Sequence, residues 1–390
     1  MNLKTQPKKM VRDSNYELMR IVSMFMIVVW HMLRHGQVDI HASGLLKNVV
    51  YFIEAILIVH VNSYVLVTGY YQCKSKFKLK KLISLNNQAW FYRVVILTIL
   101  LIYDIVKIGE VELLQSLFPL DFSAYWFIKM YLILYCFSPF LNRLIEKISK
   151  KEFQVLLMTC FIIFSVLPTI SMQIIYNNGG GYSLTNFVFL YLLGAYFRYY
   201  PIQKSRIFEV NTRRKNQLIF LLGFISCFFV NFLLSCFSEI LFQGGNIPSF
   251  FGQTISLFFL SYDNPLVVVG SLMYFFWFGT FEIKSKFINR VSSLTLGVYL
   301  IHDNPYMRQW LYPFLGFAGE KVYTGILILG KVFLCALAVF IVCALLEWIR
   351  QLLFKGINHL KITKWFQRKW RSYVTSLGDF DLMKELEVNK

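Results

Sequence analysis

The chain has 390 residues, of which 57% are hydrophobic and only 16% are charged, and its mean hydropathy is +0.54. Soluble domains carry about 25% charged residues, so a chain this apolar cannot surround itself with water. The net charge of +19 is spread over short Lys and Arg clusters between apolar runs, which is typical of membrane topology signals rather than nucleic-acid binding. We therefore expect an all-α integral membrane protein with no nucleic-acid partner.

Apolar segments long enough to cross a bilayer follow one another along the whole chain. A transmembrane helix takes about 20 residues, and on that template we predict about ten transmembrane helices. They lie near 16–35, 48–70, 86–106, 125–143, 153–172, 184–199, 217–237, 264–282, 293–314 and 323–349. For the stretch 248–262 the sequence leaves three alternatives open: it spans the membrane, re-enters it or lies on its surface. From the basic, polar start of the sequence we expect no cleavable signal peptide.

The charges of the connecting segments predict the orientation of these helices. Lys and Arg are concentrated in 71–85, 144–152, 200–216, 283–292 and the tail from Arg350. Few occur in 107–124, 173–183, 238–263 and 315–322. Because basic loops stay on the cytoplasmic side, this alternation predicts cytoplasmic N- and C-termini.

Two regions are expected, a transmembrane domain over 1–350 and a basic cytoplasmic tail over 351–390. Within the tail, 351–375 mixes Lys and Arg with Leu, Phe and Trp at roughly helical spacing. This predicts an amphipathic helix on the inner leaflet, in contact with anionic lipids. The seven Cys residues are scattered through apolar segments without metal-ligand spacing, so we expect neither a disulfide framework nor a bound metal.

The first span carries two ionisable residues that a bilayer does not tolerate without a partner or water. Arg20 and His31 are eleven positions apart, which places them on nearly the same helix face with a rise of about 16 Å. A pantetheine arm has a comparable length, so the pair suits an Arg that binds a phosphate and a His that meets a thioester. An Arg at a cytoplasmic helix end and a His packed between helices would account for each residue separately.

The ninth span carries a second polar group. His302, Asp303 and Asn304 are followed by Pro305, which is expected to kink or interrupt the helix. Such a break is tolerated where it lines protein or a water-filled cavity, although it would also fit a simple helix end.

Further polar or aromatic candidates lie at other depths. On the cytoplasmic side, Lys80, Lys81 and Arg93 flank the third span and are expected to meet phosphates, unless they serve topology alone. The remaining candidates are Glu54 and His60 in the second span, Tyr125, Trp126 and Lys129 in the fourth, and Asp263 and Asn264 before the eighth. The chain contains no Gly-rich phosphate loop, no GxSxG elbow and no HExxH helix, so a Ser-nucleophile mechanism has no support.

These residues carry a resemblance to a known family. A basic residue, ten residues and then a His mark the first span of the membrane acyltransferase-3 family, and Arg20 with His31 matches that pattern. SYVLVTGYYQCKSKFKLKKLISL, SAYWFIKMYLILYCFSPFLNRLI and SSLTLGVYLIHDNPYMRQWLY also resemble the bacterial exopolysaccharide and capsule O-acetyltransferases of that family. The resemblance runs over roughly residues 13 to 350.

The resemblance implies a ten-helix fold in a bacterial cell membrane. Acetyl-CoA would be the cytoplasmic acyl donor, and the acceptor would be a lipid-linked or polymeric glycan on the other side. His31 would be the catalytic His and Arg20 the cofactor-binding residue. Many relatives carry an RxxR motif at the start of the third span, where this chain has Lys80 and Lys81, with Arg93 further along.

A mechanism can be written for these residues. A sugar hydroxyl needs a base to accept its proton, and neutral imidazole suits this role. We expect His31 to be that base or a transient acyl carrier, with His302 and Asp303 sharing the base role or placing the acceptor. Arg20, Lys80, Lys81 and Arg93 are expected to bind CoA. The acceptor-binding candidates are Glu54, Tyr125, Trp126 and Asn304.

Two other classes of protein are alternatives. A polysaccharide flippase, transporter or polymerase is also basic, aromatic and polytopic, but a flippase would usually show about twelve or more spans in paired halves. A channel or sensor is less consistent with the sequence, which has no charged voltage helix. The sequence leaves open which acyl group and which sugar hydroxyl are used, and whether the protein is a homodimer.

Overall fold

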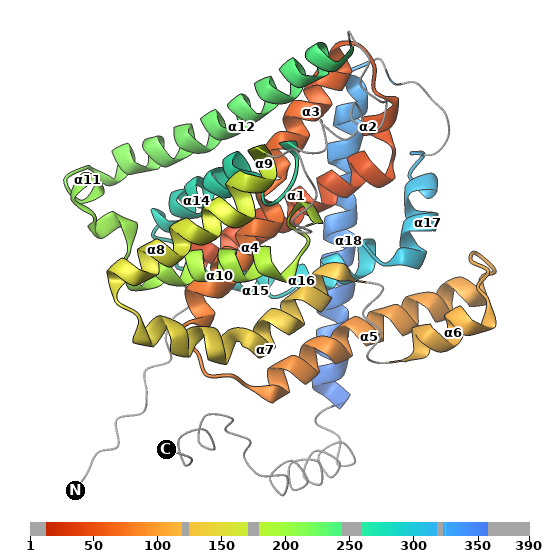
Figure 1. Ribbon diagram of the computed structural model, residues 1–390. Coiled ribbons are helices and arrows are strands. Elements are labelled where there is room, and N and C mark those ends of the chain that lie inside the picture. Colours follow the sequence, from red (N-terminus) through yellow and green to blue (C-terminus); the bar gives the residue numbers. More distant parts are fainter. Residues whose placement is uncertain are drawn as a thin grey trace, which may run out of the picture.

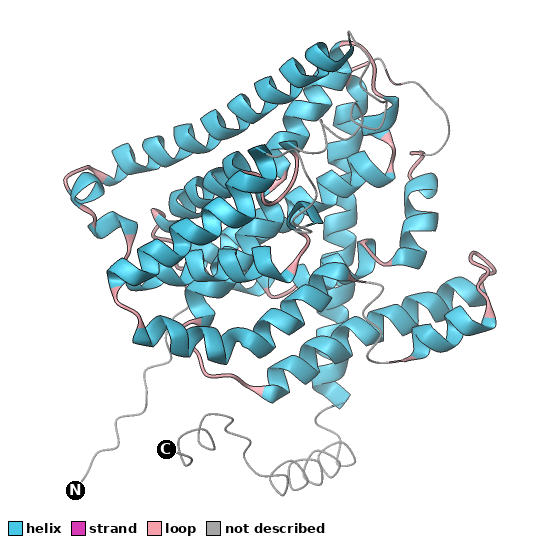
Figure 2. Cartoon of the chain, in the orientation of Figure 1, coloured by secondary structure: helices cyan, strands magenta, loops and turns pink. Residues whose placement is uncertain are grey.

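The computed structural model describes residues 13–118, 125–170, 179–243, 259–317, 323 and 325–357 (Figure 1). Within these ranges the chain forms helices joined by short loops, and no strand is present (Figure 2). An isolated bridge pairs Ala42 with Tyr323. The all-α prediction is confirmed. The predictions for 1–12, for most of 248–262 and for the tail beyond 357 fall outside the described residues.

Seven helical segments of the described chain are long and apolar enough to cross a membrane. Five are α1 (Ser14–His35), α5 (Leu79–Ile102), α7 (Trp126–Lys147), α12 (Arg213–Gln243) and α18 (Leu327–Ile357). The other two are formed by consecutive helices: α3 (Leu45–Leu57) with α4 (Val59–Gln72), and α8 (Lys150–Phe161) with α9 (Leu167–Ile170). A π-helical segment, Ile162–Val166, joins α8 to α9. The chain is therefore an integral membrane protein. The total of ten spans and the cytoplasmic termini stay predictions.

The other three predicted spans are helical but short or interrupted. The segment 184–199 forms α10 (Leu184–Tyr199), and 264–282 forms the apolar helix α14 (Pro265–Gly279). The segment 293–314 is divided into α16 (Thr295–His302) and α17 (Pro305–Phe314). None of the three reaches the length of a straight transmembrane helix by itself.

The helices α1, α3 and α4 form the centre of the bundle. In the most apolar window of α1, and of the α3–α4 segment, 67% of residues are buried, compared with 17% for α8–α9 and 28% for α12. The helix α1 contacts α3, α4, α14, α16, α17 and α18. Figure 1 shows α12 along one edge of the helical body and α5 with α6 (Glu110–Leu117) extending from the opposite side. The polar residues of α1 therefore face protein, while the outer helices present apolar side chains to lipid.

Two glycines allow α4 and α10 to approach closely. A Cβ at Gly69 would overlap the carbonyl oxygen of Tyr191, and a Cβ at Gly194 would overlap that of Leu66. Small residues at a crossing bring helix backbones into van der Waals contact, which is a main source of helix association in lipid.

The break between α16 and α17 is formed by the polar residues before Pro305. The side chain of Asn304 accepts hydrogen bonds from the amides of Tyr306 (3.0 Å) and Met307 (3.3 Å), and Pro305 occupies the first turn of α17. An N-cap Asn followed by Pro is a standard way to begin a helix. The predicted interruption is confirmed, and it places Asp303 between two helix ends.

A buried carboxylate fixes α18 against α5 and α16. Glu347 accepts hydrogen bonds from the Tyr92 hydroxyl (2.5 Å) and from Arg350 Nε and Nη2 (2.7 Å each). A Cβ at Gly297 of α16 would lie 2.5 Å from the Cβ of Glu347. Since α16 carries His302, this contact helps set the position of the polar break.

Candidate active site

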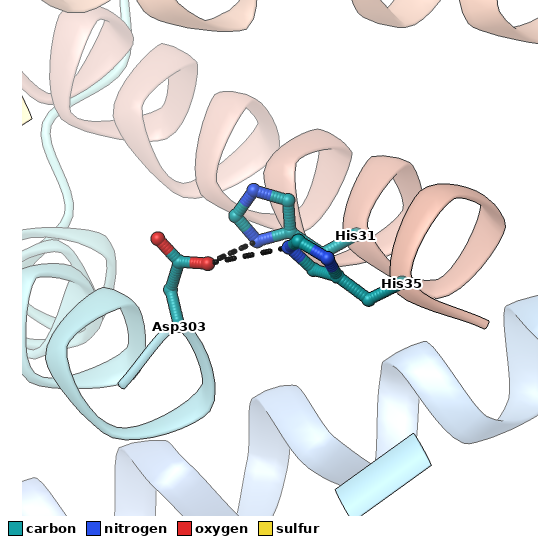
Figure 3. A group of neighbouring side chains, drawn as sticks. All are labelled: His31, His35 and Asp303. Carbon is teal, nitrogen blue, oxygen red and sulfur yellow. Dashed lines mark ion pairs between the residues drawn. The ribbon is translucent and has the colours of Figure 1, made fainter. Parts of the chain in front are cut away.

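The structure brings His31, His302 and Asp303 together. The Nδ1 atom of His31 lies 3.2 Å from Asp303 Oδ1 (Figure 3). The same nitrogen lies 3.0 Å from His302 Nε2. His31 comes from the C-terminal half of α1, and the other two come from the end of α16. The side chains of His302 and Asp303 are buried and that of His31 is nearly so. The three predicted catalytic residues thus form one cluster.

Hydrogen bonds assign the protons of the two imidazoles. His302 Nδ1 lies 2.6 Å from the carbonyl oxygen of Val298, which can only accept, so this nitrogen carries a proton. In a neutral ring the Nε2 atom of His302 is then an acceptor, and it faces His31 Nδ1. Asp303 Oδ1 is a second acceptor for the same His31 nitrogen. His31 Nδ1 is therefore the protonated nitrogen, and its Nε2 keeps a free lone pair.

Two residues that the sequence interpretation missed complete the cluster. Arg308 places Nε at 2.9 Å and Nη2 at 2.7 Å from Asp303 Oδ1, and His35 Nε2 lies 3.7 Å from the same oxygen. His35 follows His31 by four positions, so helical periodicity alone would have put both on one face. Arg308 lies in the first turn of α17, and only the fold of the break brings it back to Asp303.

His31, His35 and Asp303 offer ligand atoms of the types that bind a metal ion, all within 4.8 Å of one another (Figure 3). The guanidinium of Arg308, however, already pairs with the Asp303 carboxylate at 2.7 Å. A metal ion on this carboxylate would lie beside that fixed positive charge, and the two would repel each other strongly in a site of low dielectric. The residues fit a charge-paired His cluster better than a metal site.

Asn304 and Tyr125 join this cluster to α7. Asn304 Nδ2 donates to the Tyr125 hydroxyl (2.8 Å), which donates to the carbonyl oxygen of Leu300 (2.8 Å). Tyr125 is buried, so its ring is not available for a sugar. The next residue, Trp126, is only partly buried, and its ring lies 4.5 Å from that of Tyr182 and 6.1 Å from that of Tyr262.

Glu54 is paired with Arg34, another residue that the sequence interpretation missed. The Nε atom of Arg34 lies 2.7 Å from Glu54 Oε1, and its Nη1 lies 3.1 Å from Asp39 Oδ2. Burial raises the pKa of the Asp39 carboxyl, and the charge of Arg34 opposes this rise. Glu54 is fully buried, so the structure places it behind Arg34 and not in contact with an entering molecule.

Arg20 lies at the other end of α1. Its Nη1 is 3.2 Å from Glu17 Oε1, its side chain is 28% exposed, and its carbonyl oxygen accepts from the Tyr64 hydroxyl (2.7 Å). The other oxygen of Glu17 accepts from Ser292 (2.5 Å). Eleven helical positions give a rise of about 16 Å between Arg20 and His31, so the two do not touch.

The remaining cofactor-binding candidates are separated by the fold. Lys80 and Lys81 are exposed at the start of α5, and Lys81 Nζ lies 4.7 Å above the ring of Tyr135. Arg93 is buried, with Nη2 3.4 Å from the Ser116 hydroxyl, and that hydroxyl lies 2.5 Å from the hydroxyl of Tyr306. Twelve positions along α5 put Arg93 about 18 Å from Lys81. Arg93 thus lies near the start of α17, away from the two lysines.

The candidates His60, Asp263 and Asn264 have contacts typical of packing and helix capping. His60 is buried between the rings of Trp30 (5.6 Å) and Tyr262 (5.8 Å). Asn264 caps α14 by accepting from the amide of Leu266 (2.9 Å), and Asp263 is buried beside it.

Comparison with known families agrees with this geometry. The acyltransferase-3 family model, described as an acyltransferase domain, matches residues 13–348, which contain the whole His–Asp cluster and Arg20. No curated protein and no solved structure matches the chain. With a match over most of its length, the chain belongs to the acyltransferase-3 family and is a membrane acyltransferase.

Proposed function

We propose that the protein transfers an acetyl group from cytoplasmic acetyl-CoA to a sugar hydroxyl of an extracytoplasmic or lipid-linked polysaccharide in a bacterial cell membrane. The observation that carries the proposal is the free Nε2 of His31, which the hydrogen bonds to His302 and Asp303 leave as the basic nitrogen. Membership of the acyltransferase-3 family supports the class of reaction.

The reaction follows from that nitrogen. As the acceptor hydroxyl attacks the thioester carbonyl, His31 Nε2 removes its proton, and the new ester C–O bond forms while the C–S bond breaks. The CoA thiolate leaves and takes the proton from the imidazolium. Asp303, 3.2 Å from His31 Nδ1, stabilises that imidazolium and fixes the ring orientation. Such general base catalysis contributes about 10²- to 10⁴-fold to the rate.

The donor is expected to reach His31 along α1. Arg20 lies in the N-terminal half of α1, and Lys80 and Lys81 are exposed at the beginning of α5. The end of α4 connects the two regions, because Lys81 Nζ lies 3.4 Å from Gln72 Oε1 and the Tyr71 hydroxyl lies 3.4 Å from Asp13 Oδ2, just before α1. These three cations are the proposed contacts for the CoA phosphates, and the rise of about 16 Å to His31 suits the pantetheine arm. Arg93 is buried beside Ser116, so we propose that it holds α6 near α17 and does not bind the phosphates.

The experiment uses purified protein in lipid nanodiscs with acetyl-CoA labelled in the acetyl group. His31→Ala should lower acetyl transfer to the polysaccharide by at least about 10²-fold while CoA binding is retained. Arg20→Ala should weaken CoA binding instead. His41→Ala, a His at the end of α2 (Val38–His41) outside the cluster, is the matched control and should behave like the wild type. Full activity in both test variants would reject the assignment, and glycan movement without label transfer would favour a flippase.

The same assay separates the two roles open to His31. If His31 were a transient acyl carrier, rapid quenching without acceptor would trap labelled protein, and His31→Ala would abolish the label. A general base leaves the protein unlabelled under the same conditions.

A further inference from the structure

A run of three glycines builds a loop that nothing in the proposed chemistry uses. Gly179, Gly180 and Gly181 have φ angles of +55°, +64° and +83°, a region in which residues with a Cβ are disfavoured. A Cβ at Gly181 would lie 2.6 Å from the Cβ of Tyr262 and 2.8 Å from the amide nitrogen of Asp263. The carbonyl oxygen of Gly180 accepts a hydrogen bond from the amide of Tyr262 (2.9 Å). The loop is therefore docked closely on the segment before α14.

The docked loop holds Tyr182 against two other aromatic rings, to which its ring is tilted by 52° and 59°. The Tyr182 ring lies 4.5 Å from that of Trp126 and 5.0 Å from that of Tyr262, and the latter two rings are stacked at 26°. Tyr262 is 3% exposed, whereas Tyr182 is 47% exposed. We call Trp126, Tyr182 and Tyr262 the aromatic platform. Two of its rings support a third that is about half exposed.

The platform lies close to the His–Asp cluster. The Tyr262 ring lies 5.8 Å from that of His60, which lies 5.6 Å from the ring of Trp30 on α1. The guanidinium of Arg34, which directly precedes His35 on α1, lies 5.0 Å from the Trp30 ring. In addition, Trp126 directly follows Tyr125, which is hydrogen-bonded to Asn304 beside Asp303. Tyr and Trp also anchor membrane proteins at the lipid–water interface. That role alone would not require the three rings to lie near the His–Asp cluster.

We propose that Tyr182, supported by Trp126 and Tyr262, is the surface on which a pyranose ring of the acceptor glycan stacks before its hydroxyl reaches His31. This inference rests on the proposed function. The C–H face of a sugar ring is apolar and slightly positive, and it complements the negative face of an aromatic ring. The hydroxyls at the ring edge then stay free for hydrogen bonding and for transfer.

The test measures acetyl transfer in nanodiscs to oligosaccharides released from the surface glycan of the source cells and de-esterified with mild base. Tyr182→Ala should raise the KM for these oligosaccharides by about three- to tenfold. It should leave unchanged the KM for acetyl-CoA and the slow hydrolysis of acetyl-CoA without acceptor. Tyr182→Phe keeps the ring and should behave like the wild type. Tyr103→Ala is the matched control, since Tyr103 is 73% exposed at the end of α5, outside the platform.

The outcomes separate the two proposals. Transfer by Tyr182→Ala with an unchanged KM for the oligosaccharides would overturn the platform and leave the proposed function intact. A loss in Tyr182→Phe equal to that in Tyr182→Ala would show that the hydroxyl matters and not the ring, which also overturns it. An equal rise in both KM values would indicate a structural defect and contradict stacking. No transfer by the wild type to these oligosaccharides would overturn both proposals.

Discussion

The two ends of α1 are built very differently. At the C-terminal end, the positive or protonatable groups of His31, His35 and Arg34 are held by three carboxylates, Asp303, Glu54 and Asp39. At the N-terminal end, Arg20 has an ion pair with Glu17 of its own helix and is partly exposed. A charge cluster enclosed in protein is pre-organised for chemistry, whereas a half-exposed guanidinium is suited to a ligand that arrives and leaves.

The largest effect on turnover is expected from Asp303, the carboxylate that His31 and His35 at the C-terminal end of α1 share. Asp303→Asn removes the negative charge that orients His31 and neutralises Arg308, so turnover should fall by about 10³-fold or more. CoA binding at the distant Arg20 should be retained. Turnover and CoA affinity are measured on the same nanodisc preparation, with Asp104→Asn at the exposed end of α5 as control. Turnover within tenfold of the wild type would contradict the role given to Asp303.

The second largest effect is expected from Glu54, the partner of Arg34, and it concerns stability. Glu54→Gln leaves the partly buried guanidinium of Arg34 with one carboxylate fewer, which is expected to lower the free energy of unfolding by about 2 kcal/mol. Thermal unfolding in nanodiscs measures this, and Glu112→Gln on the exposed helix α6 should leave the melting temperature unchanged. If Glu54→Gln melted like the wild type and lost acceptor binding instead, Glu54 would be an acceptor ligand and not the support of Arg34.

A third substitution, Gly297→Ala in α16, should disturb the His–Asp cluster through helix packing. Gly297→Ala forces a Cβ against Glu347, so α16 must move and carry His302 with it; the expected cost is about 2 kcal/mol of stability. Transfer should fall along with the melting temperature. Gly330→Ala in α18 is the control, because its Cβ would meet no described atom within 4 Å and Ala favours a helix. A Gly297→Ala protein as stable and active as the wild type would mean that α16 is not fixed by this contact.

The smallest effect is expected at the N-terminal end. Glu17→Gln removes the charge that pairs with Arg20, so CoA should bind about threefold more tightly at low salt, and the gain should shrink as salt is added. Glu282→Gln is the control, because it removes one negative charge from an exposed residue near the N-terminal end of α1. CoA affinity that rises equally in both variants would reflect net charge alone, and no rise in Glu17→Gln would argue against Arg20 as a phosphate contact.

The sequence was most informative where the signal is local. Long apolar runs predicted the helices, and Pro305 after Asn304 predicted the break between α16 and α17. His31 and Asp303 were recognised because each is costly in a bilayer. Local periodicity was also sufficient to place His35 beside His31, although that pair was overlooked.

Contacts between distant helices were not predictable from the sequence. His31 meets His302 across 271 positions, and only the packing of α16 on α1 shows that they share a hydrogen bond. The same limit explains why Arg93 was grouped with Lys80 and Lys81: all three belong to one helix, but its length separates them. Tyr125 is an acceptor-binding candidate in the sequence, but the structure buries it, with its hydroxyl hydrogen-bonded to Asn304, a contact that no sequence pattern reveals.

The most direct measurement is nitrogen NMR of the intact protein in nanodiscs with ¹⁵N-labelled histidine, in which the His31 signals are identified by their absence in His31→Ala. The account predicts a proton on Nδ1 of His31 and a bare Nε2 in the resting enzyme. A proton on Nε2, with Nδ1 as the bare nitrogen, would contradict it, because the nitrogen proposed to accept the proton of the sugar hydroxyl would then already hold one.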